Sequence, residues 1–352
     1  MSAPVISGAT ADLAASLTRA RRSRTARRAA AVGCLAALVL VLFAVSLMVG
    51  HTFYGLGDVL RVVAGQNVPG ASFTVGELRL PRACLGLLVG ACFGAGGVTF
   101  QTMLRNPLAS PDVIGIEQGA SAAAVFAVVF LSVGQMTVSV IAIVAALLTA
   151  LAIYVLSFKD GVVGTRLILI GIGVAAMLHS VVTYVLARAD QWDLQMAMRW
   201  LTGSLNSADW DVVVPLAIGT VVVAPLLLSQ SRNLDLLLLG DDAASALGVP
   251  VERTRLLAIL AAVCLLAFAT AAAGPVAFVA FLSGPIAARL VGPGVSLVVP
   301  SALVGSALVL GADLVGQWVF GTRYPVGVIT GALGAPFLVY LLVRAQRTGG
   351  SL

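Results

Sequence analysis

"LGDDAASALGVPVERTRLLAILAAVCLLAFATAAAG", from Leu239 to Gly274, joins a short polar stretch to a long apolar run that starts at Leu256. A second apolar run ending in "VVVAPLLLS" comes just before it. Each run approaches the roughly 20 residues that an α-helix needs to cross the hydrocarbon core of a bilayer. Long apolar runs joined by short polar connections predict a chain that crosses a membrane several times.

The overall composition supports this prediction. Of the 352 residues, 60% are hydrophobic and only 10% are charged, with a mean hydropathy of +1.05. A soluble domain carries about 25% charged residues, so this chain could not cover a water-facing surface. Only helices and closed barrels satisfy every backbone group inside a bilayer. The apolar runs are continuous and do not alternate as barrel strands do, which predicts an all-α polytopic membrane protein.

Ten candidate spans follow from the apolar runs. They are Ala29–Gly50, Ala83–Leu104, Pro111–Leu131, Met136–Phe158, Gly164–Ala187, Trp210–Leu228, Thr254–Ala273, Val276–Leu290, Ser296–Phe320 and Pro325–Val343. The glycine-rich stretches within 86–97 and 327–334 predict close helix packing, because small residues let two backbones approach each other.

The basic residues predict the orientation, since they favour the cytoplasmic side. With ten spans and a cytoplasmic N-terminus, six arginines of "RARRSRTARR" and nine later Lys and Arg residues fall inside, whereas six fall outside. The chain therefore divides into a basic segment (1–28), one transmembrane domain (29–347) with a cytoplasmic loop at about 229–255, and a tail (348–352). The arginine cluster is interpreted as a topology determinant near anionic lipid, not as a nucleic-acid site.

Local signals in the polar stretch predict a short helix from Asp242 to Leu247. Asp241 or Asp242 can cap its start, Gly248 suits a left-handed helix ending, and Pro250 suits the first turn of the next helix. Two interpretations remain open on these residues alone. The helix is either a docking face for a soluble partner or part of a structured connection.

The chain has no visible energy source of its own. A phosphate-binding loop needs G-x-x-x-x-G-K-[ST], and the single lysine, Lys159 in "LSFKDG", lacks that frame. Either another subunit hydrolyses ATP or an ion gradient drives the protein. Asp313 and His179 are the ionisable residues at membrane depth, and structural hydrogen bonding explains two scattered groups more simply than a proton relay does. Four separated cysteines show no disulfide or metal spacing.

Several long motifs resemble the FecCD family, the iron-siderophore and vitamin B12 permeases of type II ATP-binding-cassette (ABC) importers. The main one is "RLPRACLGLLVGACFGAGGVTFQTMLRNPLASPDVIGIEQGA" (Arg79–Ala120). Others are "RLILIGIGVAAMLHS", "RWLTGSLNSADW", "LGDDAASALGVPVERTRLL", "AGPVAFVAFLSGPIAARLVG" and "YPVGVITGALGAPFLVYLL". The finer likeness is to siderophore permeases of the ferric enterobactin type. Many relatives carry Pro-His where this chain has Gly284 and Pro285.

The resemblance implies a ten-helix permease in the bacterial cytoplasmic membrane, with a second, non-identical permease subunit, two ATPase subunits and an extracytoplasmic binding protein. It implies no catalytic residue, metal or cofactor in this chain, since ATP and Mg²⁺ belong to the partner ATPase. The expected cargo is a ferric siderophore of catecholate type. Vitamin B12 or haem in the same importer class, and an ion-coupled secondary carrier, remain alternatives. A membrane-embedded enzyme is a more distant one.

The resemblance also assigns roles to residues. Arg79 and Arg82 are expected to dock the binding protein, and the fifth span is expected to help form the translocation gate. On that span His179, Ser180 and Thr183 lie on nearby faces at helical spacing and are the candidates to face the path. The residues expected to couple to the ATPase are Leu239, Gly240, Asp241, Asp242, Ala243, Ala246, Leu247, Gly248 and Val249.

Overall fold

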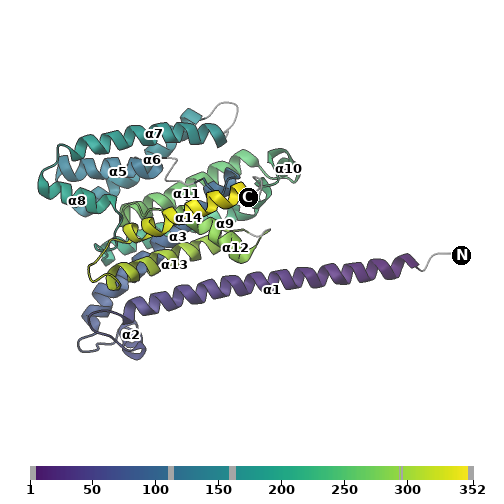
Figure 1. Ribbon diagram of the computed structural model, residues 1–352, viewed down its shortest axis with the longest axis horizontal. Coiled ribbons are helices and arrows are strands. Elements are labelled where there is room, and N and C mark those ends of the chain that lie inside the picture. The colour runs from purple at the N-terminus through teal and green to yellow at the C-terminus, as the bar shows by residue number, and fades with distance from the viewer. Residues whose placement is uncertain (1–4, 110–114, 158–163, 293, 295, 348–352) are drawn as a thin grey trace.

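A computed structural model describes residues 5–109, 115–157, 164–292, 294 and 296–347. Within these ranges the chain forms thirteen α-helices and two π-helices and no strand (Figure 1). The first are α1 (Val5–Met48), α2 (Leu56–Val63), η1 (Thr74–Arg79), α3 (Leu80–Met103), α5 (Ile116–Phe126), η2 (Ala127–Leu131), α6 (Gln135–Ser157) and α7 (Gly164–Leu186). The others are α8 (Gln191–Leu201), α9 (Trp210–Leu237), α10 (Asp241–Ala246), α11 (Val251–Ala273), α12 (Val279–Val291), α13 (Val298–Trp318) and α14 (Val326–Arg347).

All ten predicted spans correspond to helices. Seven described segments are long and apolar enough to cross a membrane, and three shorter apolar segments, Ile116–Leu131, Val279–Val291 and Val326–Leu341, match the remaining predictions. Lys159, Phe158, residues 111–114 and the predicted tail 348–352 lie outside the described residues.

Two predicted boundaries differ from the structure. Helix α9 continues to Leu237, nine residues beyond the predicted end, so the first part of the predicted cytoplasmic loop is helical. Leu234 and Leu237 are buried there and hold the polar turn "SQSR" in the helix. Helix α1 begins at Val5, so the predicted boundary at residue 28 lies inside a continuous helix that projects from the bundle (Figure 1).

The helices form an inner and an outer set. In α3, α11 and α13, 78%, 72% and 56% of the most apolar window is buried, against 17–22% in α1, α6, α7 and α9. Helix α3 packs against α9, α11, α12 and α13. The outer helices expose large apolar side chains such as Leu40, Leu148, Leu169 and Val221, as lipid-facing helices do.

Glycines explain how closely α3 and α13 approach. A Cβ added at Gly90 would lie 2.4 Å from the carbonyl oxygen of Gly305, and one added at Gly94 would lie 2.1 Å from that of Ser301. Only glycine fits such a backbone contact, which dispersion then stabilises along both helices. At Gly327 an added Cβ would lie 1.9 Å from the Thr202 oxygen. The predicted packing role of both glycine-rich stretches is confirmed.

Pro285 lies inside α12, yet the helix is continuous. Proline has no N–H, so the Phe281 carbonyl four residues earlier loses its helical donor. Gln101 of α3 replaces that donor, since its Nε2 donates to the Phe281 oxygen over 3.0 Å. Gly284 leaves room for the amide, because an added Cβ would lie 1.9 Å from Gln101 Oε1. Gln101 and Gly284 therefore compensate for Pro285.

Replacing Gln101 with leucine is expected to destabilise the protein by about 1–3 kcal/mol, the cost of leaving a buried acceptor unsatisfied. Thermal unfolding of the purified protein in detergent measures this. Gln230→Leu is the control, because Gln230 is only half-buried and the hydrogen bond that its amide donates, to the neighbouring Ser229 Oγ, is exposed. Equal unfolding temperatures for the two variants would contradict the role given to Gln101.

Candidate functional site

The connection between α9 and α11 is the predicted coupling loop, and α10 lies in it at one end of the bundle (Figure 1). Gly240 precedes α10 with a φ of 108°, a conformation that favours glycine. The predicted capping by Asp241 or Asp242 is wrong, because the N-cap is Gly240 and no side chain caps this end. Asp241 is instead drawn into ion pairs with arginines.

The predicted glycine stop after α10 is confirmed. Gly248 has a φ of 85°, its N–H donates to the Ser245 oxygen over 2.9 Å, and the Val249 N–H donates to the Ala244 oxygen over 3.0 Å. These two bonds form a Schellman motif, which satisfies carbonyls at a helix end. Pro250 is the N-cap of α11, one residue before its predicted place in the first turn.

Asp241 joins three parts of the chain. Its Oδ2 lies 2.7 Å from a guanidinium nitrogen of Arg255 in α11, and its Oδ1 accepts from Arg105, just after α3. Arg105 also donates from Nε to the Leu237 oxygen at the end of α9 over 2.8 Å. Sequence reasoning did not single out Arg105 or Arg255, although both lie in the quoted motifs. Together these contacts tie α10 to α3, α9 and α11.

The charge of Asp241 is stabilised at neutral pH. Partial burial alone raises the pKa of Asp241, but the hydrogen bond and charge of Arg255 and then those of Arg105 outweigh it, so the pKa lies below its ordinary value. A carboxylate with a lowered folded-state pKa contributes stability above its unfolded pKa, and that stability is lost as pH falls through the folded value. The ion pairs therefore persist at physiological pH.

Two substitutions distinguish the role of Asp241 from that of its neighbour Asp242. Asp241→Asn removes the charge that both arginines bind and is expected to speed backbone hydrogen exchange in α10 by about threefold to tenfold, because local opening becomes easier. Asp242→Asn is the matched control, since Asp242 is exposed and makes no hydrogen bond or ion pair among the described residues. Equal exchange in both variants would contradict the anchoring role of Asp241.

The coupling residues divide into an outer and an inner group. Val249 is buried, as is Ala244, so these side chains hold α10 to the bundle. Gly240 and Asp241 are half-buried. The exposed residues of the predicted set are Leu239, Asp242, Ala243, Ala246, Leu247 and Gly248. Leu239 and Leu247 are 64% and 60% exposed, so a largely apolar surface faces outward from an anchored helix.

Arg79 and Arg82, the predicted docking residues, are both engaged within the chain at the opposite end. Arg82 binds Asp313 of α13 through two nitrogens, at 2.7 Å and 2.9 Å, and donates to Asn206. Arg79 donates to the carbonyls of Leu47, Met48 and Thr52. These contacts give both arginines a structural role, and docking stays a prediction.

Removing one partner of the Arg82–Asp313 pair is expected to be costly. Arg82 is 19% and Asp313 4% exposed, so Arg82→Ala leaves a buried carboxylate and should cost about 3–5 kcal/mol of stability. The double variant Arg82→Ala with Asp313→Ala should recover much of that loss in a denaturation experiment. A double variant less stable than the single one would contradict this pairing. The contacts of Asp313 with Arg82 agree with the predicted structural hydrogen bonding of this residue.

The predicted path residues lie on one exposed side of α7. His179, Ser180 and Thr183 are all exposed. The hydroxyls of Ser180 and Thr183 donate to the carbonyls of Ala176 and His179 in the same helix. This face is therefore free to line a surface shared with another subunit, and its role stays a prediction.

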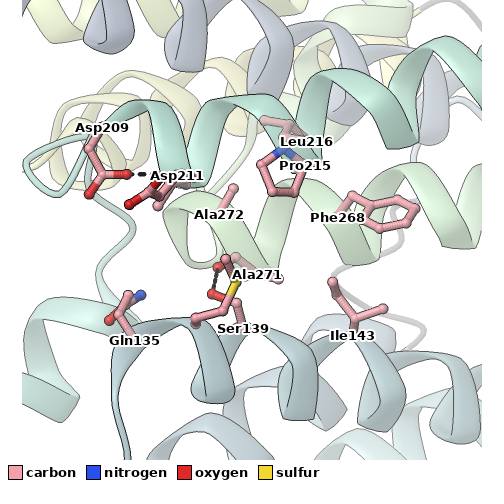
Figure 2. A pocket seen from close by; sticks show the side chains of 12 residues that line it. Gln135, Ser139, Ile143, Asp209, Asp211, Pro215, Leu216, Phe268, Ala271 and Ala272 are labelled. Carbon is pink, nitrogen blue, oxygen red and sulfur yellow. Dashed lines mark hydrogen bonds between the residues drawn. The ribbon is translucent and has the colours of Figure 1, made fainter. Parts of the chain in front are cut away.

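An apolar cavity of about 220 Å³ lies between α6, α9 and α11 (Figure 2). Asp209 and Asp211 lie at the start of α9 beside it, with Ser139 and Phe268 on the other walls. Sites for drug-sized ligands measure about 300–1,000 Å³, so this cavity is too small for a large cargo. It contains none of the predicted site residues.

These features define a multi-pass helical membrane protein with a glycine-packed core and a short, anchored, exposed helix at one end. Sequence comparison then identifies its family. The pattern of the FecCD transport family matches residues 38–344, and the chain belongs to that family.

Similarity to individual proteins supports this family assignment. The ferric enterobactin transport system permease FepG of Escherichia coli K12 is 39% identical over 294 residues, covering 82% of this chain and 88% of FepG. The achromobactin transport system permease CbrC of Dickeya dadantii is 39% identical over 313 residues, covering 88% and 90%. A solved metal-chelate type ABC transporter in an inward-facing conformation matches with a TM-score of 0.80 and 27% identity over 89% of this chain and 98% of that chain. The predicted family and all-α permease fold are confirmed.

Proposed function

We propose that this chain is the permease subunit of an ABC importer that moves a ferric siderophore of catecholate type across the cytoplasmic membrane. ATP and Mg²⁺ are held by a separate ATPase subunit. The cargo class rests on the 39% identity to permeases for ferric enterobactin and achromobactin. The coupling to ATP rests on the geometry of α10.

The observation that carries the proposal is that α10 is exposed on one side and anchored on the other. Leu239 and Leu247 face outward, whereas Asp241 is bound by Arg105 and Arg255. A push on the outer surface therefore reaches α3, α9 and α11 through short, charge-assisted hydrogen bonds, which are stronger than neutral ones. An ATPase that pushes on the exposed side of α10 can therefore move the permease without unfolding α10.

Four further subunits follow from this function. Two ATPases bind at α10 and its equivalent in a second, non-identical permease, whose path-lining surface meets the exposed face of α7. An extracytoplasmic binding protein delivers the cargo at the end that carries Arg79 and Arg82. Both termini are cytoplasmic. The arginine-rich half of α1, the end of α14 and α10 all lie at one end of the molecule (Figure 1), which agrees with the preference of basic residues for the cytoplasm.

The alternative from another class of transport protein is an ion-coupled carrier. The bonding of Asp313 is evidence against this alternative. A carboxylate that cycles protons must release its partner during transport, but Asp313 is bound by Arg82 and also accepts from Gln317 over 2.7 Å. Vitamin B12 or haem would use the same importer architecture, so the transport assay has to separate these cargoes.

The test is uptake of a radiolabelled ferric catecholate siderophore into vesicles that contain all subunits, with ATP inside and a protonophore present. Uptake that needs ATP and survives the protonophore supports the proposal. Uptake abolished by the protonophore would point to a carrier. An intact complex with active ATPase and no siderophore uptake would overturn the cargo, and labelled vitamin B12 and haem would then be tried in the same vesicles.

A further inference from the structure

A pocket between α1 and α12 contains four arginines. Arg24, Arg27 and Arg28 of α1 lie with Arg289 of α12 around a cavity of about 300 Å³, together with Leu290, Val291 and Gly292. Arg24, Arg27 and Arg28 are spaced i, i+3 and i+4, which places them on one face of the helix. Arg289 is in the last turn of α12. Two helices far apart in sequence thus direct guanidinium groups to one place.

The charge of the pocket calls for an anion. Among the described residues, its lining carries four positive charges and no carboxylate. Arg28 donates to the neutral carbonyl of Gly294 over 3.3 Å, and Arg24 and Arg27 are exposed. Guanidinium groups gathered around one pocket repel one another, and an anion between them relieves that repulsion. Arginine matches the geometry of phosphate oxygens through paired N–H donors.

The position of the pocket selects the source of the phosphate. Helix α1 turns apolar at Ala29, directly after the arginines, and Leu35 packs with Ala287 and Val304 further along the helix. Exposed apolar side chains, including Leu38 and Leu40, continue along α1. The guanidinium of Arg289 lies 5.6 Å from the ring centres of Phe337 and Tyr340, and aromatic rings gather at the level of lipid headgroups. An acyl chain can thus lie along α1 while its headgroup enters the pocket.

We propose that Arg24, Arg27, Arg28 and Arg289 form a binding site for the phosphate headgroup of an anionic phospholipid. Basic pockets between transmembrane helices on the cytoplasmic side bind such headgroups. The pocket lies on α1 just before its apolar segment and beside the last turn of α12. The bound headgroup offsets part of this positive charge and holds the arginine-bearing turns of α1 against the last turn of α12.

The experiment measures lipid binding by the full-length protein in neutral detergent, with native mass spectrometry as the readout. Phosphatidylglycerol is titrated, with phosphatidylcholine as the uncharged comparison. The test variant combines Arg24→Gln, Arg27→Gln and Arg289→Gln. It is expected to bind phosphatidylglycerol at least about tenfold more weakly, because each arginine near an anionic headgroup adds to the binding affinity. The control variant combines Arg188→Gln, Arg232→Gln and Arg253→Gln, which remove the same charge from exposed residues elsewhere. It should bind phosphatidylglycerol as the wild type does.

Equal losses in both triple variants, or no loss in either, would overturn the site. Inorganic phosphate and glycerol phosphate form a separate arm. If either displaces phosphatidylglycerol at equal concentration, the site takes a free phosphate and the assignment to a lipid is wrong. Should the triple variant fail to fold, Arg289→Gln alone is expected to weaken binding by roughly fivefold, and wild-type binding by that variant would overturn the proposal.

Discussion

Gly248→Pro is expected to lower ATP-driven uptake by roughly a hundredfold while the protein still inserts into the membrane. Gly248 has a φ of 85°, whereas proline is fixed near −65°. Proline also removes the N–H that donates to Ser245. A cost of about 3 kcal/mol shifts the equilibrium between the intact and the opened α10 ending roughly a hundredfold toward the opened form. Siderophore uptake and ATPase activity are measured together on the reconstituted complex, and their ratio gives the uptake per ATP hydrolysed.

Gly55→Pro is the matched control for this prediction. Gly55 precedes α2 at the other end of the molecule, and its φ of −66° already suits proline. Uptake by this variant should equal that of the wild type. Gly248→Ala should fall between the two, since a left-handed residue with a Cβ costs about 1–2 kcal/mol. If Gly248→Pro transported within about twofold of the wild type, the ending of α10 would not be part of the coupling route.

Gly305→Val is expected to prevent the accumulation of folded protein. An added Cβ would lie 2.1 Å from the backbone oxygen of Gly90, and a backbone contact cannot give way as a flexible side chain can. Overpacking of a core typically costs about 1–3 kcal/mol and sometimes more. Here α3 and α13 must separate along their glycine contact, so we expect a cost above that range. Size-exclusion chromatography of the detergent-extracted protein measures the folded fraction.

Gly311→Val in the same helix is the control. It makes the same chemical change, but no atom outside the surrounding turns of its own helix lies within 4 Å of the added Cβ. It should give a folded yield like that of the wild type. A poor yield from both variants would show that α13 tolerates valine badly as such, and a good yield from both would contradict the close α3–α13 contact.

The sequence predicted the helical class, the ten apolar segments and the glycine stop at Gly248, because each depends on local composition or on one residue's backbone preference. It also predicted the place of the short exposed helix α10, since the polar stretch interrupts two apolar runs. The end of α9 was missed because "SQSR" looks like a loop, and the burial of Leu234 and Leu237 that holds it helical depends on distant helices.

Contacts between distant residues were decided by the tertiary structure. Gln101 is 180 residues from Phe281 and Arg82 is 231 residues from Asp313, so nothing in the local pattern connects them. Asp241 illustrates the difference, because its position suggests a helix cap, but Arg105 and Arg255 offer charged partners that outweigh capping. The sequence alone determines which segments enter the membrane, because transfer into lipid depends on each segment's own side chains. Which polar groups pair, and which surfaces stay exposed, depends on how the helices pack, and only the folded chain brings those groups together.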